Sequence, residues 1–526
     1  MIAGKNLIAG RWSADGGAQF TSTNPRTRQP IQWQYTDASA DEIDQAVTAA
    51  VAAFTITRDL PTSARAAFLE QIAVEIEALG DELLEIADTE TGLGLPRLRG
   101  ERARTINQVR AFAVLVREGS FVDAIIDRAL PDRTPAPRPD IRRMSFPIGP
   151  TAIFTPNNFP LAFGVAGGDT ISALAAGCPV IVKGHPSYPA TCELIAGAVS
   201  RAVESSGLPA GTFSFLQGSA IAVGGALVVH PDLCAVAFTG SYRGGRAIMD
   251  AAAARVQPIP VFAEMGSVNP IVLLPGAIAA SPDALADGLV TSVTGSGGQL
   301  CTKPGLVFML RENADFIETV SAKMGERAAS ILLNESVENG LRSAVGATQA
   351  HSAVTLKAGG AVVESDGYSF ANTVMVTSAS AFAADAALHR EHFGPVVLFV
   401  LCESPDELMT TLARLEGNLT ATVHATAGEL EGTRALFDLL REKAGRLILN
   451  GFPTGVEVVA AMVHGGPFPA TSAAGTTSVG MTAIRRFLRP VALQNMPDAL
   501  LPDALKDANP LGIWRLVDNV VTRDSG

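Results

Sequence analysis

One thiol and one carboxylate, each in a turn that contains glycine, are the residues of this chain best suited to covalent chemistry. Cys301 lies in the run GGQLCT (297–302), and Glu264 lies in the run FAEMGS (262–267). The thiolate is the nucleophilic form of cysteine, and free backbone N–H groups in a turn of small residues favour it. We therefore take Cys301 as a candidate nucleophile and Glu264 as a candidate base for a second step. The alternative is a buried structural cysteine.

The apolar strand that precedes Glu264 bears on its ionisation. A carboxylate at the end of such a strand is expected to be buried, and burial disfavours its charged form. We therefore expect a raised pKa for Glu264, which suits a base that works near neutrality. The alternative is a structural carboxylate whose hydrogen bonds are satisfied.

An asparagine follows another expected strand. The run TPNNFP (155–160) contains Asn158, whose amide can donate a hydrogen bond to a developing oxyanion. The alternative is a turn built from Asn and Pro without a chemical role.

Three further motifs contain groups that suit a phosphate or a ribose. Lys183 ends the buried run VIVK, where open α/β sheets bind ligands, although a surface lysine would also fit. Gly240, Ser241 and Gly245 open a helix expected at 244–254, whose N-terminus can receive a phosphate. This GxxxxG spacing lacks the Lys-Ser/Thr of a P-loop, so a plain turn is the alternative. Glu391 in EHFGP (391–395) can accept two ribose hydroxyls, or it is a solvated turn residue.

The elements that must position these groups alternate along the chain. Apolar residues at helical spacing predict helices at 63–79 and 104–116, and a Pro-rich excursion or linker follows at 127–143. Strands are expected at 151–155, 179–183, 213–216, 233–238, 261–264 and 270–274, with helices at 164–176, 191–205 and 244–254. A second alternation includes strands at 305–310, 395–401 and 446–450. This order predicts the α/β class with parallel, doubly wound sheets.

Composition excludes several classes of function. Of the 526 residues, 47% are hydrophobic and 17% are charged, so the chain can bury a large core and disorder is not expected. The net charge of −12 argues against binding to nucleic acid or an anionic membrane. We see no secretory leader and no membrane span.

The cysteine and histidine patterns bear on the cellular compartment of the protein and on metal binding. Five cysteines without a CxxC pair indicate a reducing compartment, and we expect a cytoplasmic protein. We assign no metal, because no metal-binding spacing occurs among the remaining histidines, His230, His351, His389, His424 and His464.

Taken in order, these motifs resemble those of the aldehyde dehydrogenase superfamily, and the resemblance runs from NLIAGRW (6–12) to beyond GPF (466–468). The motif EMGSVNP (264–270), together with KGHP (183–186), resembles the corresponding motifs of one branch of this superfamily. That branch contains α-ketoglutaric semialdehyde dehydrogenases and a bacterial fatty aldehyde dehydrogenase. The resemblance implies two doubly wound parallel-sheet domains and a small antiparallel oligomerisation flap.

The resemblance also implies roles for the motif residues. Cys301 would attack the aldehyde carbonyl, and Asn158 with the Cys301 N–H would hold the oxyanion of the thiohemiacetal. Hydride transfer to a nicotinamide would leave a thioester, which Glu264 would hydrolyse with water. Cofactor-binding roles fall on eight positions: Lys183, His185, Pro186, Gly240, Ser241, Gly245, Glu391 and Phe393.

Position 186 bears on the choice of cofactor. Many members of the superfamily carry a Glu there, which binds both ribose hydroxyls and disfavours a 2′-phosphate. This chain has Pro186, and Lys183 with His185 could attract the phosphate. We therefore expect NADP to be accepted and preferred, with NAD use left open.

The best-supported substrate is α-ketoglutaric semialdehyde (2,5-dioxopentanoate), oxidised to 2-oxoglutarate. Its carboxylate calls for an arginine, and Arg104, Gln108 and Arg110 on one helical stretch are the candidates. Structural ion pairs are the alternative for these arginines. A medium- or long-chain fatty aldehyde would instead need an apolar tunnel, for which the candidates are Phe112, Phe159, Phe163 and Phe452.

The expected domains are a cofactor-binding domain (1–122 and 146–272), a catalytic domain (273–485) and the flap (123–145 and 486–526). Antiparallel flap strands would pair with a partner's sheet, so we expect a homodimer, with a tetramer as the alternative. Two rival functions stay open: a CoA-acylating enzyme, which would not need Glu264, and a non-enzymatic structural protein, which would need neither Glu264 nor Cys301.

Overall fold

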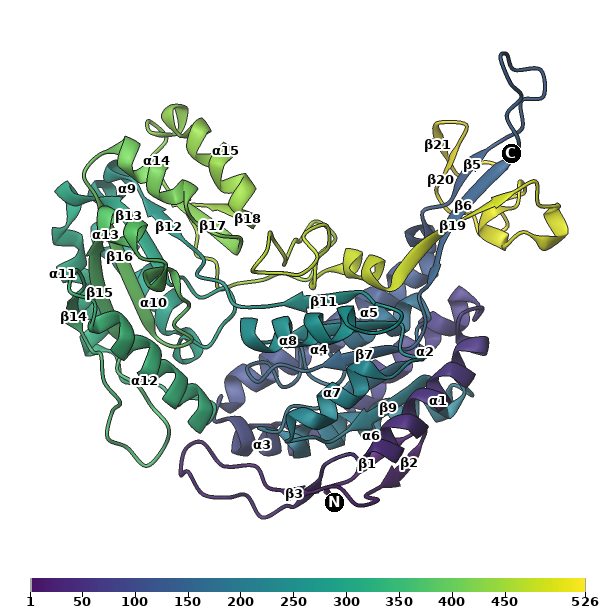
Figure 1. Cartoon of the computed structure of the whole chain (residues 1–526), viewed down its shortest axis with the longest axis horizontal. Coiled ribbons are helices and arrows are strands. Elements are labelled where there is room, and N and C mark those ends of the chain that lie inside the picture. Colours follow the sequence, from purple (N-terminus) through teal and green to yellow (C-terminus); the bar gives the residue numbers. More distant parts are fainter. Residues whose placement is uncertain (1, 526) are drawn as a thin grey trace.

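Three sheets organise the chain, and the computed structural model describes residues 2–525 of it. Figure 1 shows one sheet with its helices at the left, a second at the centre, and the five-stranded sheet projecting at the upper right. The predicted α/β fold with two doubly wound domains and a flap is confirmed by this arrangement.

The central sheet carries the first set of predicted motifs. Its seven strands follow the order β11-β10-β7-β8-β9-β1-β2, and the five from β11 to β9 are parallel. The antiparallel hairpin β1–β2 extends the sheet through the pair Leu7↔Phe215. The strands are β1 (Asn6–Ile8), β2 (Arg11–Ser13), β7 (Thr151–Phe154), β8 (Val180–Lys183), β9 (Phe213–Leu216), β10 (Ala235–Thr239) and β11 (Val261–Glu264).

Helices cover both faces of this sheet, because successive strand residues point to opposite sides. Val180 and Val182 of β8 join one core, and Ile181 between them joins the other. The first core includes helices α2 (Thr62–Glu77), α3 (Gly80–Thr91), α4 (Leu95–Glu118), α5 (Gly168–Ala176) and α6 (Pro189–Ser205). The second core includes α1 (Ala40–Thr57), α7 (Ile221–Val229) and α8 (Tyr242–Ala253).

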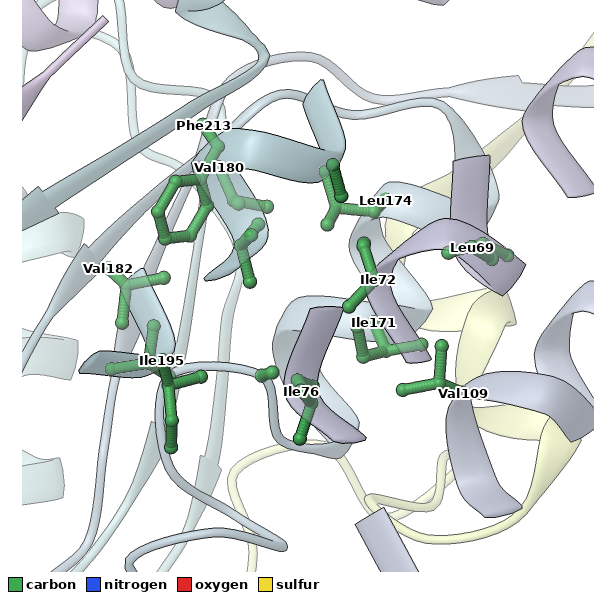
Figure 2. Close-up of a cluster of buried hydrophobic side chains, with 14 of the residues drawn as sticks. Leu69, Ile72, Ile76, Val109, Ile171, Leu174, Val180, Val182, Ile195 and Phe213 are labelled. Carbon is green, nitrogen blue, oxygen red and sulfur yellow. The ribbon is translucent and has the colours of Figure 1, made fainter. Parts of the chain in front are cut away.

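The first core holds α4 in place, and α4 later proves important for the site. Figure 2 shows buried side chains from α2, α4, α5, α6, β8 and β9 that converge there, namely Leu69, Ile72, Ile76, Val109, Ile171, Leu174, Val180, Val182, Ile195 and Phe213. Phe112 of α4 belongs to the same core and is 1% exposed, so it does not line a substrate tunnel. The helix predicted at 104–116 is thus the second half of a longer helix that begins after Gly94.

The second sheet follows the order β14-β15-β16-β13-β12-β17-β18, parallel except for β14 at one edge. Its strands are β12 (Ile271–Leu273), β13 (Leu306–Leu310), β14 (Thr355–Ala358), β15 (Thr373–Ser378), β16 (Val396–Cys402), β17 (Asn418–His424) and β18 (Ala444–Leu449). Its helices are α9 (Pro275–Ala280), α10 (Pro282–Thr294), α11 (Asp315–Glu326), α12 (Glu335–Gln349), α13 (Ala379–Ala384), α14 (Pro405–Ala413) and α15 (Arg434–Lys443).

The chain then returns to the central sheet. Met265 N donates to Ala470 O over 2.8 Å, and Ile148 N donates to Phe487 O over 3.0 Å. Figure 1 shows this returning segment, in yellow-green, between the two large parts of the molecule. Ala483 and Ile484, which we had expected within the catalytic domain, and Phe487, which we had expected in the flap, therefore belong to the core of the cofactor-binding half.

The flap is a five-stranded sheet of order β19-β6-β5-β20-β21. Its strands are β5 (Ile125–Asp127), β6 (Ile141–Pro147), β19 (Leu488–Gln494), β20 (Arg515–Val517) and β21 (Val520–Thr522). The Pro-rich segment predicted as a linker at 127–143 thus forms the tip and one arm of a hairpin. The pairs are antiparallel except β5 with β20, which run parallel. A separate two-stranded sheet joins β3 (Gln19–Phe20) to β4 (Tyr35–Thr36).

None of the helices in residues 2–525 combines the length and the apolar character that crossing a bilayer requires.

Candidate active site

The loop that carries Cys301 follows α10 through a tight turn at 295–298. Ser296, Gly297 and Gly298 all have positive φ values, 52°, 65° and 67°. A Cβ atom on Gly298 would overlap the backbone of Gly394, so a residue without a side chain is required at this contact. The close approach fixes the Cys301 loop against the loop that carries Glu391.

Asn269 connects the Glu264 turn to the Cys301 loop. Its Nδ2 donates to Cys301 O over 2.8 Å and to Lys303 O over 3.0 Å. Asn269 is fully buried and has a φ of 47°, a conformation that Asn tolerates better than most residues. The side-chain amide of Asn269 therefore holds the Glu264 turn and the Cys301 loop together by binding backbone carbonyl groups.

Glu264 lies at the end of β11 and is 3% exposed. Its Oε2 lies 2.7 Å from His464 Nδ1 and also accepts a hydrogen bond from Ser478 Oγ. Its Oε1 is buried and has no hydrogen-bond partner within residues 2–525. One oxygen is thus held in place, and the other is available to a water or a substrate.

The expected rise in the Glu264 pKa is wrong. Burial does oppose ionisation, but the charge of His464 and the hydrogen bonds from His464 and Ser478 outweigh it and lower the pKa. The apolar run before Glu264 correctly predicted that its carboxylate is buried. The two partners that lower its pKa, His464 and Ser478, come from a segment about 200 positions farther along the chain, so the sequence did not predict them.

His464 completes a chain of contacts that the sequence analysis missed. Its Nε2 lies 3.4 Å from Cys301 Sγ, so the imidazole joins the thiol to Glu264. Burial alone would lower the pKa of His464, but the charges of Glu264 and Cys301 raise it to about 10. His464 and Cys301 are 163 positions apart, and that spacing carries no motif.

The donor atoms of Glu264, Cys301 and His464 lie within 4.8 Å of one another, a proximity that also occurs in metal sites. Here the two nitrogens of His464 each face one of the other groups. Nδ1 must carry a hydrogen toward the carboxylate, and Nε2 faces the sulfur. The arrangement suits proton transfer between thiol, imidazole and carboxylate.

Asn158 lies beside the Cys301 loop. Its Nδ2 donates to Gln299 O over 3.0 Å, which leaves one amide hydrogen free to donate elsewhere. Arg97 of α4, which the sequence analysis did not identify, donates from NH2 to Asn158 O over 2.6 Å. The structure therefore brings Cys301, Glu264 and Asn158 together.

The predicted substrate residues divide into two groups. Arg104 and Gln108 lie on the face of α4 that also carries Arg97, whereas Arg110 lies at the surface, where it forms an ion pair with Glu77 over 3.1 Å. Arg110 does not belong with the site, because six positions along a helix turn its side chain well away from Arg104. Its predicted role in substrate binding is therefore wrong.

The two predicted phenylalanines also differ in their surroundings. Phe159 packs on Phe163, with 5.2 Å between ring centroids, and Phe163 lies 6.3 Å from the ring of His464. Phe452 instead packs against His424, with 4.9 Å between ring centroids, in the core of the second sheet. Phe159 therefore borders the site, and Phe452 packs elsewhere.

On the cofactor side, the N-terminus of α8 lies next to Glu264. Gly240 N donates to Glu264 O over 3.0 Å, and Ser241 caps the helix by accepting from Gly244 N over 3.2 Å. A Cβ on Gly245 would press against Met265 at 2.6 Å. The predicted glycines thus let the helix terminus approach the site closely, and a helix N-terminus favours phosphate.

Lys183 ends β8, and His185 follows two residues later. Lys183 Nζ donates to Gly218 O over 2.6 Å, and burial lowers the pKa of Lys183 to about 8. Burial also lowers the pKa of His185 to about 3, and its ring stacks on Tyr188. The expectation that His185 attracts a phosphate by its charge is wrong, because its imidazole is neutral at physiological pH. Pro186 follows and adds no carboxylate.

A cavity of about 340 Å³ lies between α8 and the Glu391 loop, and its lining includes Tyr242, Gly266, Glu391 and Phe468. A Cβ on Gly266 would overlap the Glu391 carboxylate. Burial raises the pKa of Glu391 to about 7, and Lys303 partly offsets this rise. Phe393 lies in the same loop. A carboxylate in a cavity beside a helix N-terminus fits the ribose and phosphates of a dinucleotide.

Comparison with known proteins gives consistent results. The model of the aldehyde dehydrogenase family matches residues 12–488. The chain is 47% identical to alpha-ketoglutaric semialdehyde dehydrogenase 2 of Azospirillum brasilense over 98% of this chain and 99% of that protein. It is 43% identical to the alpha-ketoglutaric semialdehyde dehydrogenase of Acinetobacter baylyi, over 99% of each chain. Betaine aldehyde dehydrogenase of Staphylococcus aureus has a similar structure, with a TM-score of 0.80, 20% identity and coverage of 95% and 98%.

Proposed function

Because the chain belongs to the aldehyde dehydrogenase family, we propose that it oxidises α-ketoglutaric semialdehyde to 2-oxoglutarate. The chain is an NAD(P)-dependent aldehyde dehydrogenase. The names of two relatives that are 43–47% identical over nearly the whole chain support the substrate. The observation that carries the mechanism is the 3.4 Å contact between Cys301 Sγ and His464 Nε2, with Glu264 behind the imidazole.

The first step is attack by Cys301 on the aldehyde carbonyl. His464 takes the thiol proton through Nε2, and its pKa, raised to about 10, favours the protonated imidazolium that results. Sulfur then bonds to the carbonyl carbon, and the carbonyl oxygen becomes an oxyanion. The free amide hydrogen of Asn158 and the N–H of Cys301 are the donors we assign to that oxyanion.

A bound nicotinamide would supply the acceptor for the hydride that leaves the carbon attached to Cys301. The residues that would hold the cofactor are Lys183 at the end of β8, Ser241 at the start of α8, and Glu391. A fixed Asn158 keeps the carbon and oxygen oriented during this step, because Arg97 and Gln299 restrain its backbone and side chain.

The last step is hydrolysis of the Cys301 thioester. Glu264 is ionised, and its Oε1 is the carboxylate oxygen without a partner, so it can accept a proton from an attacking water. The hydroxide oxygen bonds to the acyl carbon, the carbon–sulfur bond breaks, and the acid leaves. The Cys301 thiolate returns to its position beside His464.

We further propose that NADP is preferred to NAD. Lys183 provides a cation, and Pro186 provides no carboxylate that would repel a 2′-phosphate. We also propose that the enzyme works in the cytoplasm, which the five free cysteines support. Homo-oligomerisation is supported by β19, which lies at an open edge of the flap sheet and can pair with another strand.

The test is reduced-cofactor formation by the purified protein with NADP and with NAD. The substrates are α-ketoglutaric semialdehyde and a long-chain aldehyde, each with and without CoA. We expect preferential turnover of the semialdehyde with NADP, no stimulation by CoA, and no turnover by Cys301→Ala. Preference for the long-chain aldehyde would overturn the proposed substrate, and retained activity of Cys301→Ala would overturn the nucleophile. A Cys234→Ala variant is the matched control, since Cys234 lines a separate pocket outside the site.

A further inference from the structure

A stripe of polar side chains runs along the face of α4 that approaches the site. Arg97, Glu101, Arg104 and Gln108 recur at intervals of three and four residues, the spacing that places residues on one side of a helix. Glu101 and Gln108 are buried, and the two arginines are partly buried. Two guanidinium groups and one carboxylate leave one positive charge on this stripe.

Two members of the stripe have protein partners. Arg97 donates to Asn158 O over 2.6 Å and lies 3.8 Å from the Glu101 carboxylate. Glu101 Oε1 accepts hydrogen bonds from Leu161 N at 2.8 Å and from Ala162 N at 3.0 Å. These contacts position the Asn158 loop, and Arg97 and Glu101 form an ion pair with each other.

Arg104 differs from Arg97, because its guanidinium has no such partner. The donor atoms Nε and NH2 of Arg104 are buried and have no hydrogen-bond partner within residues 2–525, and the donor Nε2 of Gln108, one turn away, also has none. Leaving a charged donor buried and unpaired is costly, and such groups are normally satisfied by protein, water or a ligand.

The position of Arg104 relates it to the nucleophile. Its Cζ lies 5.7 Å from the ring centroid of Phe163, and Phe163 lies against His464, which contacts Cys301. Burial lowers the pKa of Arg104, while the charges of Glu101, Cys301 and Glu457 raise it. Arg104 is therefore close enough to Cys301 for the two groups to affect each other electrostatically.

Another arginine, Arg446, also lies close enough to Cys301 for the charge of Cys301 to affect the pKa of Arg446. Its NH1 donates to Gly455 O over 2.7 Å and its NH2 donates to Pro453 O over 2.5 Å. Both terminal nitrogens are thus used to hold the 453–455 loop, so Arg446 has a structural role that Arg104 lacks.

We infer that Arg104 binds the carboxylate of the substrate and makes the site selective for aldehydes that carry a carboxylate at the far end. The inference deepens the proposed function and rests on it. A guanidinium presents a fork of donors that matches a carboxylate, and the 2-oxo group beside that carboxylate offers one more acceptor. The same unpaired guanidinium penalises a neutral aldehyde, which would leave it buried without a partner.

The test compares kcat/KM of the wild type, Arg104→Met, Arg104→Lys and the surface control Arg110→Met. The substrates are α-ketoglutaric semialdehyde, succinic semialdehyde and pentanal. We expect Arg104→Met to lose about a hundredfold on both carboxylates, as for a lost charged hydrogen-bond pair, and to retain or improve its activity on pentanal. Arg104→Lys should lose less, because it keeps the charge without the fork. Arg110→Met should match the wild type.

Binding gives a second readout that does not depend on turnover. In a Cys301→Ala background, calorimetry should detect 2-oxoglutarate binding, and adding Arg104→Met should weaken it by a comparable factor. Equal losses of Arg104→Met on pentanal and on the semialdehydes, or unchanged binding of 2-oxoglutarate, would overturn the inference. A wild type that uses succinic semialdehyde better than α-ketoglutaric semialdehyde would instead overturn the proposed substrate, and the role of Arg104 would stand if the carboxylates still depend on it.

Discussion

The carboxylate of Glu264 accepts a hydrogen bond from His464 Nδ1 over 2.7 Å, with both side chains almost completely buried. This contact orients the imidazole so that Nε2 faces Cys301 Sγ. A base oriented by a third group is the arrangement that activates nucleophiles in many unrelated enzymes. Glu264 is thereby connected to the nucleophile itself, in addition to the role in hydrolysis that we propose for it.

We predict that His464→Gln slows the attack of Cys301. Loss of a positioned acid–base group costs about 10²–10⁴-fold in rate. The rate of alkylation of Cys301 by iodoacetamide should fall in parallel with kcat/KM, because the thiolate loses its cationic partner. His230→Gln, which changes a half-buried histidine paired with the exposed Asp44, is the control. Unchanged alkylation of His464→Gln would contradict the prediction.

The His464–Glu264 pair also predicts how stability depends on pH. His464 has a folded pKa of about 10 against an ordinary value of 6.5, so its contribution is complete below pH 6.5 and is lost as the pH rises through 10. Glu264 has a lowered pKa, so its contribution is present above pH 4.5 and is lost only as the pH falls through that lowered value. The pair therefore stabilises most between pH 4.5 and pH 6.5.

The measurement is the difference in Tm between the wild type and His464→Gln from pH 4.5 to pH 10. The difference should be largest between pH 4.5 and pH 6.5 and should shrink steadily toward pH 10. A difference that grows as the pH rises would show that the imidazole is not protonated in the folded protein.

We predict that Glu264→Gln separates acylation from hydrolysis. A glutamine can still accept the hydrogen bond from His464 Nδ1, but it cannot take a proton from water. Rapid mixing should therefore give a burst of one reduced cofactor per active site, followed by turnover slowed by about a hundredfold or more. Intact-mass measurement should detect the acyl adduct on Cys301. Slow turnover without a burst and without an adduct would mean that the variant is impaired before the thioester forms, which would contradict the prediction.

Pro186→Glu should shift the enzyme from NADP toward NAD. The added carboxylate would repel the 2′-phosphate near Lys183 and could accept the hydroxyls of an unphosphorylated ribose. We expect the ratio of kcat/KM for NADP to that for NAD to fall by at least about tenfold, the effect of a 1.4 kcal/mol change in relative binding. Pro186→Gln, which is similar in size but uncharged, is the control. An equal shift in both variants would mean that shape, and not charge, sets the preference.

Local patterns predicted much of this molecule. Parallel strands bury both faces and therefore appear as short apolar runs, so the alternation that builds β7 to β11 was visible in the sequence. Polar or small residues directly after those runs marked Lys183, Gly240 and Glu264, because the carboxyl ends of parallel strands meet at one edge of the sheet. Burial of Glu264 was predicted for the same reason.

Contacts between segments that are far apart in the chain could not be predicted from local sequence patterns. Arg104 and Arg110 look alike in the sequence, and the register of α4 against the first core decides that one approaches the site while the other pairs with Glu77 at the surface. The sign of the Glu264 pKa shift was decided by His464 and Ser478, which lie about 200 positions away in the chain.

The sequence by itself determined which residue types could do the chemistry and which strands present them, since both follow from local spacing and hydrophobicity. Only the tertiary structure decided that His464 stands between Cys301 and Glu264, that Arg97 restrains Asn158, and that Arg104 is left without a partner. The physical reason is that pKa values and hydrogen bonds depend on distances of a few ångströms, and these distances are set by packing between segments that no local pattern relates.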